Sequence, residues 1–172
     1  MSQEQNGFTV TIPGTLTDFK LSIPGKMPGL NEYVEANRTN HHKGAQMKRD
    51  CQEAVQWRIK SQIRQRRIKK PVFLLFTFYE KDRRRDHDNV SSFARKVIQD
   101  ALVASGVLQD DGWNHVTGYL DLFRVDPQHP RIVVQFIEQE EIKSAKKNKT
   151  GVSRGKSGGA ASVGRVPGGS RK

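Results

Sequence analysis

The segment from Val72 to Tyr79 constrains the fold most strongly. It reads VFLLFTFY, with apolar side chains at odd and even positions alike. A strand with one face in water alternates apolar and polar residues, whereas a strand covered on both faces stays apolar throughout. The sequence therefore predicts a central, buried strand at 72–79, with the other elements arranged around it.

Weaker patterns on both sides of this segment predict the remaining elements. Alternating residues predict two N-terminal strands at 8–12 and 19–23, which Pro13-Gly14 would join as a hairpin. The same alternation predicts a closing pair of strands at 115–124 and 131–138. Apolar residues at helical spacing predict helices over about 44–67 and 90–105, and the segment 24–42 is rich in turn residues. This order predicts an α+β fold with a mixed, largely antiparallel sheet and two main helices.

The C-terminal part differs in composition from the rest of the chain. Of the net charge of +12, a large share lies in residues 143–172, which hold nine basic and no acidic residues, together with seven of the 15 glycines. Such a segment cannot bury enough apolar surface to offset the entropy of ordering. We therefore expect a folded domain at 1–142 and a disordered basic tail at 143–172. The tail attracts polyanions such as nucleic acid, or it serves only solubility.

Several classes of protein are disfavoured by what the sequence lacks. No apolar stretch approaches the roughly 20 residues of a membrane span. The single cysteine, Cys51, excludes an internal disulfide, and no glycine-rich phosphate loop is present. We expect a cytoplasmic protein with no membrane contact and no small-molecule cofactor.

Two pairs of aspartates, one on each side of the second predicted helix, are the candidate chemical groups. Asp86 and Asp88 follow the buried strand, and Asp110 and Asp111 follow the helix. If the chain is still extended at 86–88, the first two carboxylates project to the same side. Close carboxylates repel unless a cation lies between them, and Mg²⁺ prefers such hard oxygen ligands. Each motif alone also fits a simpler interpretation, in which Asp88 or Asn89 caps the helix and Asp110-Asp111 forms a turn.

Two further residues near these acids have alternative interpretations. Lys96 lies off the apolar stripe of the helix, four residues before Asp100, so it forms an exposed ion pair or points at a scissile phosphate. Trp113 follows the second acidic pair. We expect it to be buried at the edge of the core rather than stacked on a base.

The segment RRRDHDNVSSFARKVIQDALVASGVLQDDGW at 83–113 resembles the RusA family of Holliday junction resolvases. The shared pattern consists of DxDN at 86–89, Lys96 four residues before Asp100-Ala101-Leu102, Gly106-Val107, and Asp110-Asp111. PGLNEY at 28–33 also resembles the family, and the resemblance covers about residues 19–138. The chain departs from the short form of the family at Ser92. In the short form, the lysine follows the second aspartate by four residues. That position holds Ser92 in this chain, and Lys96 comes one helical turn later.

The resemblance implies a Mg²⁺-dependent endodeoxyribonuclease that acts as a homodimer and resolves four-way DNA junctions by paired symmetric nicks, in DNA recombination and repair. Asp86, Asp88 and Asp111 would be the metal ligands and Lys96 the catalytic lysine. Basic and polar side chains would bind DNA phosphates, namely Arg83, Arg84, Arg85, Asn31, Lys48 and Arg49, and the possible auxiliary residues are Asn89, Asp100 and Asp110. Two alternatives are a non-catalytic, structure-selective DNA-binding protein and a nuclease of the same chemistry that prefers flaps or other branches.

Overall fold

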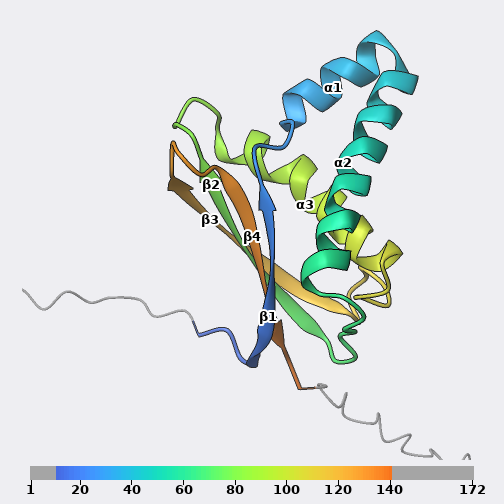
Figure 1. The fold of residues 1–172 in the computed structure, drawn as a ribbon, viewed down its shortest axis with the longest axis vertical. Helices are drawn as coiled ribbons and strands as arrows, with labels where there is room; N and C mark the ends of the chain where they lie inside the picture. Colours follow the sequence, from blue (N-terminus) through green and yellow to red (C-terminus); the bar gives the residue numbers. More distant parts are fainter. Residues whose placement is uncertain (1–10, 141–172) are drawn as a thin grey trace, which may run out of the picture. The chain divides into compact units, whose positions relative to one another are not determined.

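A computed structural model describes residues 11–140, which form an α+β fold of four strands and three helices (Figure 1). The strands are β1 (Thr15–Pro24), β2 (Val72–Glu80), β3 (Val116–Val125) and β4 (Arg131–Glu138). The helices are α1 (Leu30–Thr39), α2 (His41–Gln62) and α3 (His87–Ala104). The strands form one mixed sheet in the order β1-β4-β2-β3, in which β2 and β3 are parallel and the other pairs antiparallel. The predicted fold class is confirmed at this level, with three helices in place of two main ones.

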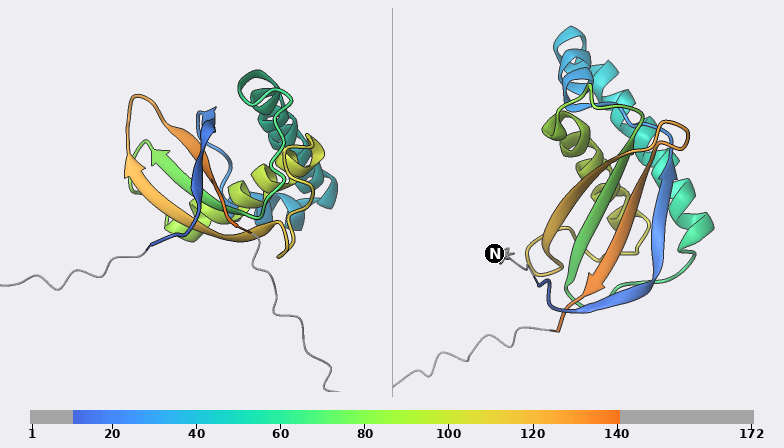
Figure 2. Two further views of the ribbon diagram at one scale, coloured as in Figure 1. Left: turned by 90° about the horizontal axis from the view of Figure 1, so that it is seen from below. Right: turned by 90° about the vertical axis from the view of Figure 1, so that its left-hand side faces the viewer.

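The helices cover one face of the sheet, as both views in Figure 2 show. Side chains of β2 alternate accordingly: Leu74, Phe76 and Phe78 are fully buried on the helical side, whereas Phe73 and Leu75 on the other side are only partly buried. The prediction of a central strand is confirmed. Burial on both faces is not found, because no described element covers the second face of the sheet.

The N-terminal hairpin predicted from the sequence is wrong within the described residues. Thr11 and Ile12 form no strand, and positions 8–10 lie outside residues 11–140. One edge of β1 pairs with β4. On the other edge, the side chain of Gln62 accepts a hydrogen bond from the Ser22 N–H (2.8 Å) and donates one to the Ser22 carbonyl (2.7 Å). The end of α2 thus occupies the edge at which a hairpin partner would bind.

The two C-terminal strands do not pair with each other, contrary to prediction. Because α3 carries the chain back between β2 and β3, these two strands run parallel. β4 then pairs with the opposite edge of β2 and lies between β2 and β1. Alternation along each strand indicates which faces are apolar, but it does not specify which strand is the neighbour.

The predicted helices are found with corrected boundaries. The stripe on α3 is buried as predicted, from Val90 to Leu102, and Gly106 with φ +69 follows the end of the helix. α2 ends at Gln62 rather than near 67, and Arg64 is left-handed with φ 60. The sequence did not predict α1, which has no fully buried residue. Asn40 separates the two helices, since its N–H donates to Ala36 of α1 and its side chain accepts from the N–H of His42.

The predicted basic tail at 143–172 and the predicted domain boundary after residue 142 both lie outside the described residues. Within residues 11–140, no helix is both long and apolar enough to cross a membrane.

Candidate functional site

Asp86 and Asp88 lie at the start of α3, close to the end of β2. Asp86 is the N-cap, and its Oδ1 accepts a hydrogen bond from the N–H of Asn89 at 2.7 Å. His87 opens the helix and Asp88 is exposed in the first turn. Negative charge is favourable at a helix N-terminus, because the peptide dipoles present their positive ends there. The expectation of extended chain at 86–88 is therefore wrong, as is the alternative of Asp88 or Asn89 as the cap.

A cavity of about 630 Å³ lies at this start of α3, beside the ends of the parallel strands β2 and β3. Its polar lining includes the acids Asp82 and Asp86 and the basic residues Arg83 and Arg124. The ring of His87 stacks on Phe123 with centroids 4.0 Å apart, which ties the start of the helix to β3. In α/β units, ligands commonly bind at the carboxyl ends of parallel strands, so the position suits a binding site.

Asn89 holds the start of α3 against the start of α1. Its Oδ1 accepts a hydrogen bond from the N–H of Asn31 at 2.9 Å. A side chain at Gly29 would collide with Asn89, so glycine permits this close approach. One turn further along each helix, Tyr33 and Phe93 stack with centroids 4.6 Å apart. Two of the segments that belong to the resemblance, 28–33 and 86–89, thus contact each other, and Asn89 has a structural role.

A second polar cluster lies beside the C-terminal half of α3 and consists of Lys48, Lys96, Asp100 and Asp111. Lys96 Nζ lies 2.8 Å from Asp100 Oδ1 and 3.0 Å from Asp111 Oδ2. Lys48 Nζ lies 2.7 Å from the other oxygen of Asp100. The structure therefore brings together Lys96 and Asp111, which are 15 residues apart in the sequence.

The lysines of this cluster compensate its negative charge. Burial alone would raise the pKa of Asp100, but hydrogen bonds from Lys48 and Lys96 and their positive charges outweigh it and lower that pKa. Hydrogen bonds to Asp100 and then Asp111 raise the pKa of Lys96. Asp100 and Lys96 are therefore an ionised pair over the whole neutral range.

The predicted metal ligands do not meet in one cluster. Lys96, which contacts Asp111, is eight residues beyond Asp88, and eight residues of helix rise by about 12 Å. Within residues 11–140, no three side chains of His, Cys, Asp or Glu lie close enough together to share a metal ion. Magnesium sites often use only one or two carboxylates, with water and substrate phosphate as the other ligands. The donors at the start of α3 therefore fit Mg²⁺ in kind, without forming a site of three acids.

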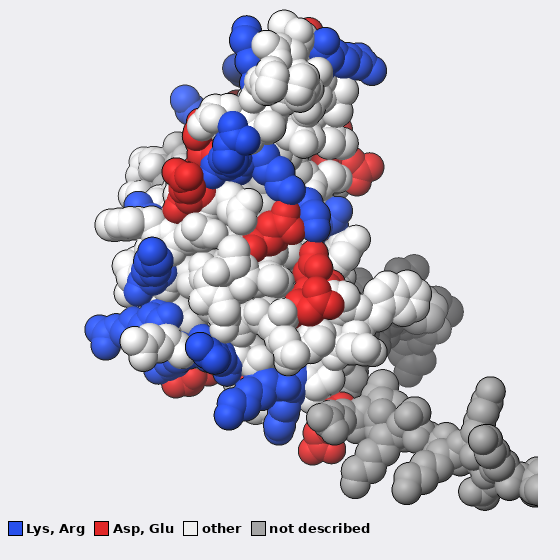
Figure 3. Space-filling model, turned by 90° about the vertical axis from the view of Figure 1, so that its right-hand side faces the viewer, with Lys and Arg blue, Asp and Glu red and all other residues white. Residues whose placement is uncertain are grey.

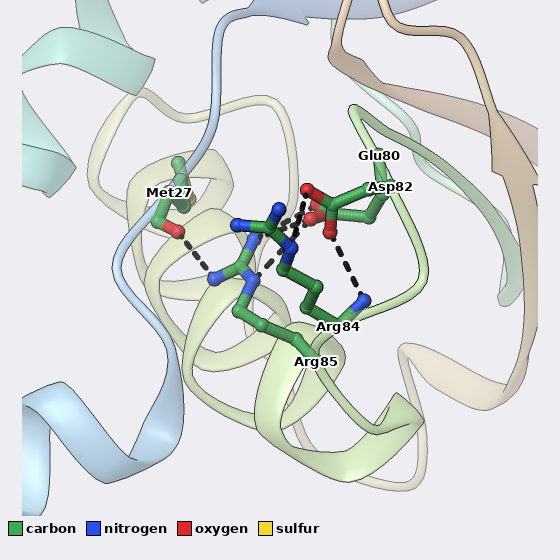
Figure 4. A network of polar contacts seen from close by, with 5 residues as sticks. All are labelled: Met27, Glu80, Asp82, Arg84 and Arg85. Atoms are coloured by element: carbon green, nitrogen blue, oxygen red, sulfur yellow. Dashed lines mark hydrogen bonds and ion pairs between the residues drawn. The ribbon is translucent and has the colours of Figure 1, made fainter.

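The basic residues predicted to bind DNA have different surroundings. Arg85 donates to both oxygens of Glu80, at 2.7 and 2.9 Å, and to the Met27 carbonyl at 3.0 Å (Figure 4). Its side chain is only 12% exposed, so it joins β2 to the segment before α1 and is not available to DNA. The Arg84 side chain is 88% exposed; its guanidinium lies 3.6 Å from the Asp82 carboxylate, which also accepts the Arg84 N–H at 3.0 Å. Arg83, Asn31 and Arg49 are also exposed, whereas Lys48 belongs to the second cluster.

Charged side chains are unevenly distributed over the surface. On the face drawn in Figure 3, acidic side chains gather near the centre, with basic side chains above and below them. Trp113 is 96% exposed, so the prediction that it is buried at the edge of the core is wrong. Asp110, three residues before Trp113, is exposed as well.

The chain was compared with models of known protein families and with curated proteins. No family model matches it, and no curated protein matches it either. Its function is therefore inferred from the residues and their geometry, together with the resemblance of the segment 83–113.

Proposed function

We propose that the protein is a Mg²⁺-dependent endonuclease that cuts branched DNA, with the four-way junction as its substrate, in DNA recombination and repair. The contact between Lys96 and Asp111 carries this proposal. Relative to the short form of the RusA family, four residues are added between Asp88 and Lys96. The segment from Lys96 to Asp111 nevertheless folds so that its lysine and its acids converge.

The metal would be held by Asp86 and Asp88 at the start of α3, with phosphate of the substrate as a further ligand. Asp111 lies with Lys96 rather than with these two acids, and it would hold the lysine in place. A Mg²⁺ ion held there would lower the pKa of a bound water and draw negative charge from the phosphate oxygens.

Lys96 acts on the phosphate through its own charge. Asp100 and Asp111 fix its ammonium in place, and 58% of its side chain is exposed to solvent. A fixed cation beside the scissile group stabilises the negative charge that develops in the transition state. In-line attack by water would leave a 5′-phosphate and a 3′-hydroxyl. Arg83, Arg84, Asn31 and Arg49 would bind neighbouring phosphates, which fixes the position of DNA without reading its sequence.

Symmetric nicks in a four-way junction require two active sites, so the protein would act as a C2 homodimer. The sheet face opposite the helices is a suitable interface. It carries apolar side chains on all four strands, with Leu16 55% and Leu120 41% exposed. Four strands of about 4.8 Å spacing and some 27 Å length present on the order of 500 Å² of flat area per copy, close to the lower limit for a specific dimer. We call this surface the open sheet face. Its other apolar members are Phe73, Leu75, Leu122, Val133 and Ile137.

The proposal is tested with purified protein and a synthetic four-way junction, in Mg²⁺ or in chelator. Paired cuts at symmetric positions that require Mg²⁺ are expected. Binding without cleavage in Mg²⁺ would favour the alternative of a non-catalytic DNA-binding protein. Preferred cleavage of flaps or three-way branches in a substrate panel would favour the alternative nuclease. Sedimentation of Leu120→Glu tests the dimer, and a variant that stays dimeric would exclude the open sheet face as its interface.

A further inference from the structure

The exposure of the Trp113 side chain is not explained by packing within the fold. It is 96% exposed in the loop between α3 and β3, two residues after Asp111. An exposed tryptophan leaves a large apolar area in water and contributes little to the core. Tyr119, near the start of β3, is 50% exposed. Two exposed aromatic side chains near a candidate catalytic cluster suggest that this surface binds a ligand.

A cavity of about 330 Å³ connects the two aromatic side chains. It is lined by Gln99, Asp111, Trp113, Tyr119 and the start of β3 from Val116 to Gly118. The guanidinium of Arg95 lies 4.3 Å from the centroid of the Tyr119 ring and is anchored by an ion pair with Asp121. The cavity therefore combines aromatic surfaces with the amide of Gln99. These are groups that can contact the face and the edge of a planar heterocycle.

The charges around the cavity favour a base over a phosphate or an apolar protein segment. Asp111 lines the cavity and Asp110 is exposed beside it, so a phosphate would be repelled there. Lys96 lies on the other side of Asp111 and offers the positive charge that a phosphate needs. A nucleotide with its base at Trp113 would thus place its backbone toward Lys96. Bases stack readily on aromatic side chains, whatever their sequence.

We propose that Trp113 and Tyr119 form a stacking site for an unpaired base of branched DNA, beside the Lys96–Asp111 pair. The proposal rests on the proposed function, because it assumes that branched DNA is the substrate. It adds a basis for substrate selection. A duplex keeps its bases stacked inside, whereas a branch point presents bases that can leave the stack at lower cost.

The test measures binding in chelator, so that cleavage plays no part. The full-length protein is titrated with a four-way junction, a single-stranded oligonucleotide and a duplex of the same sequence. Trp113→Ala is expected to weaken binding to the first two on the order of tenfold and binding to the duplex little. Trp113→Phe, which keeps a ring that can stack, is expected to restore most of the affinity. In a Trp57→Phe background, the emission of Trp113 should be quenched by the single strand.

Trp57 on α2 supplies the matched control, because it is also exposed, at 62%, and stacks with Arg58. Trp57→Ala should bind all three DNAs like the wild type. Equal losses for duplex and single strand in Trp113→Ala, or no loss, would overturn the stacking site while leaving the nuclease proposal intact. A change of oligomeric state in Trp113→Ala without DNA would mean that the surface binds protein instead, which also overturns the stacking site. If the wild type bound no DNA at all, the proposed function itself would fail.

Discussion

The start of α3 and its C-terminal half both carry aspartates, but these aspartates have different neighbours. At the start of the helix, Asp86 accepts a backbone N–H, and Asp88 is exposed. Beside the C-terminal half, Asp100 of α3 and Asp111 of the loop that follows it accept hydrogen bonds from lysine ammonium groups. The same type of side chain is therefore held by a helix dipole at one end and by full positive charges at the other.

This difference separates two roles that the sequence motif combines. A carboxylate paired with an ammonium has its charge compensated and attracts a metal ion weakly. Within residues 11–140, no basic side chain forms an ion pair with Asp86 or Asp88, so their charge remains available to an added cation. We infer that the start of α3 is the principal metal-binding end and that the C-terminal half positions Lys96 for the phosphate. Variants at the two ends should then fail in different ways.

Asp88→Asn is expected to have the largest effect. It should abolish cleavage of a four-way junction and leave binding unchanged or tighter, because it removes a metal ligand and a repulsion with phosphate. Cleavage and affinity are measured side by side, with Asp82→Asn as the control, since Asp82 is another exposed acid a few residues before Asp88. A wild-type cleavage rate in Asp88→Asn would show that the metal site has been assigned to the wrong end of the helix.

Lys96→Ala tests the other end. If its ammonium stabilises the transition state, single-turnover cleavage should fall about 10²–10³-fold, equivalent to ~2–4 kcal/mol, with little change in affinity. Lys48→Ala is the matched control, because Lys48 also binds Asp100 at 2.7 Å but the sequence motif does not include it. Similar small losses of stability and normal cleavage in both variants would reduce Lys96 to an ion-pair partner.

The sequence predicted the parts of this arrangement that depend on local pattern. The apolar stripe of α3 and the central position of β2 follow from residue spacing alone. α1 was missed because it has only 10 residues, lies in a segment rich in turn residues, and makes contacts, such as Tyr33 on Phe93, with a distant segment. The neighbour of β4 was not predictable, because alternation does not determine strand order.

At the site, spacing placed Lys96 near Asp100, since residues four apart share a helix face. Asp111 reaches the same lysine only through the loop after α3, which the resemblance suggested but periodicity could not. The exposure of Trp113 was predicted wrongly, because a lone aromatic residue in a loop carries no periodic signal of its surroundings. The Arg85–Glu80 pair was missed for a similar reason, since both residues stand in a run of charges that resembles a solvated loop.

Arg84 and Arg85 are neighbours in the segment before α3, but one is exposed and the other is largely buried. Arg85 and Glu80 have side chains only 12% and 17% exposed, so Arg85→Ala leaves a carboxylate without its partner and should cost about 3 kcal/mol of unfolding free energy. Arg84→Ala should melt like the wild type and bind DNA more weakly, with a salt dependence reduced by about one unit. Thermal melts and salt titrations of both variants check this. Equal stability of the two would mean that the Arg85 network contributes little to the fold.

The smallest expected effect concerns pH and involves only the cluster of Lys48, Lys96, Asp100 and Asp111. Because the folded state lowers the pKa of Asp100 below its ordinary value of 3.8, ionised Asp100 stabilises the protein above that value, and this contribution is lost as the pH falls through the lowered pKa. For Lys96 the pKa is raised above 10.5, so its contribution is present below that value and is lost as the pH rises through the raised pKa.

Asp100→Asn should therefore lose about 1 kcal/mol or less of unfolding free energy at neutral pH, and the difference from the wild type should shrink in acid below pH 3.8. Urea unfolding of both proteins from neutral pH into that acid range measures the difference. A difference that stays constant across the range would show that Asp100 acts through packing, and that its ion pairs with Lys48 and Lys96 do not contribute to stability.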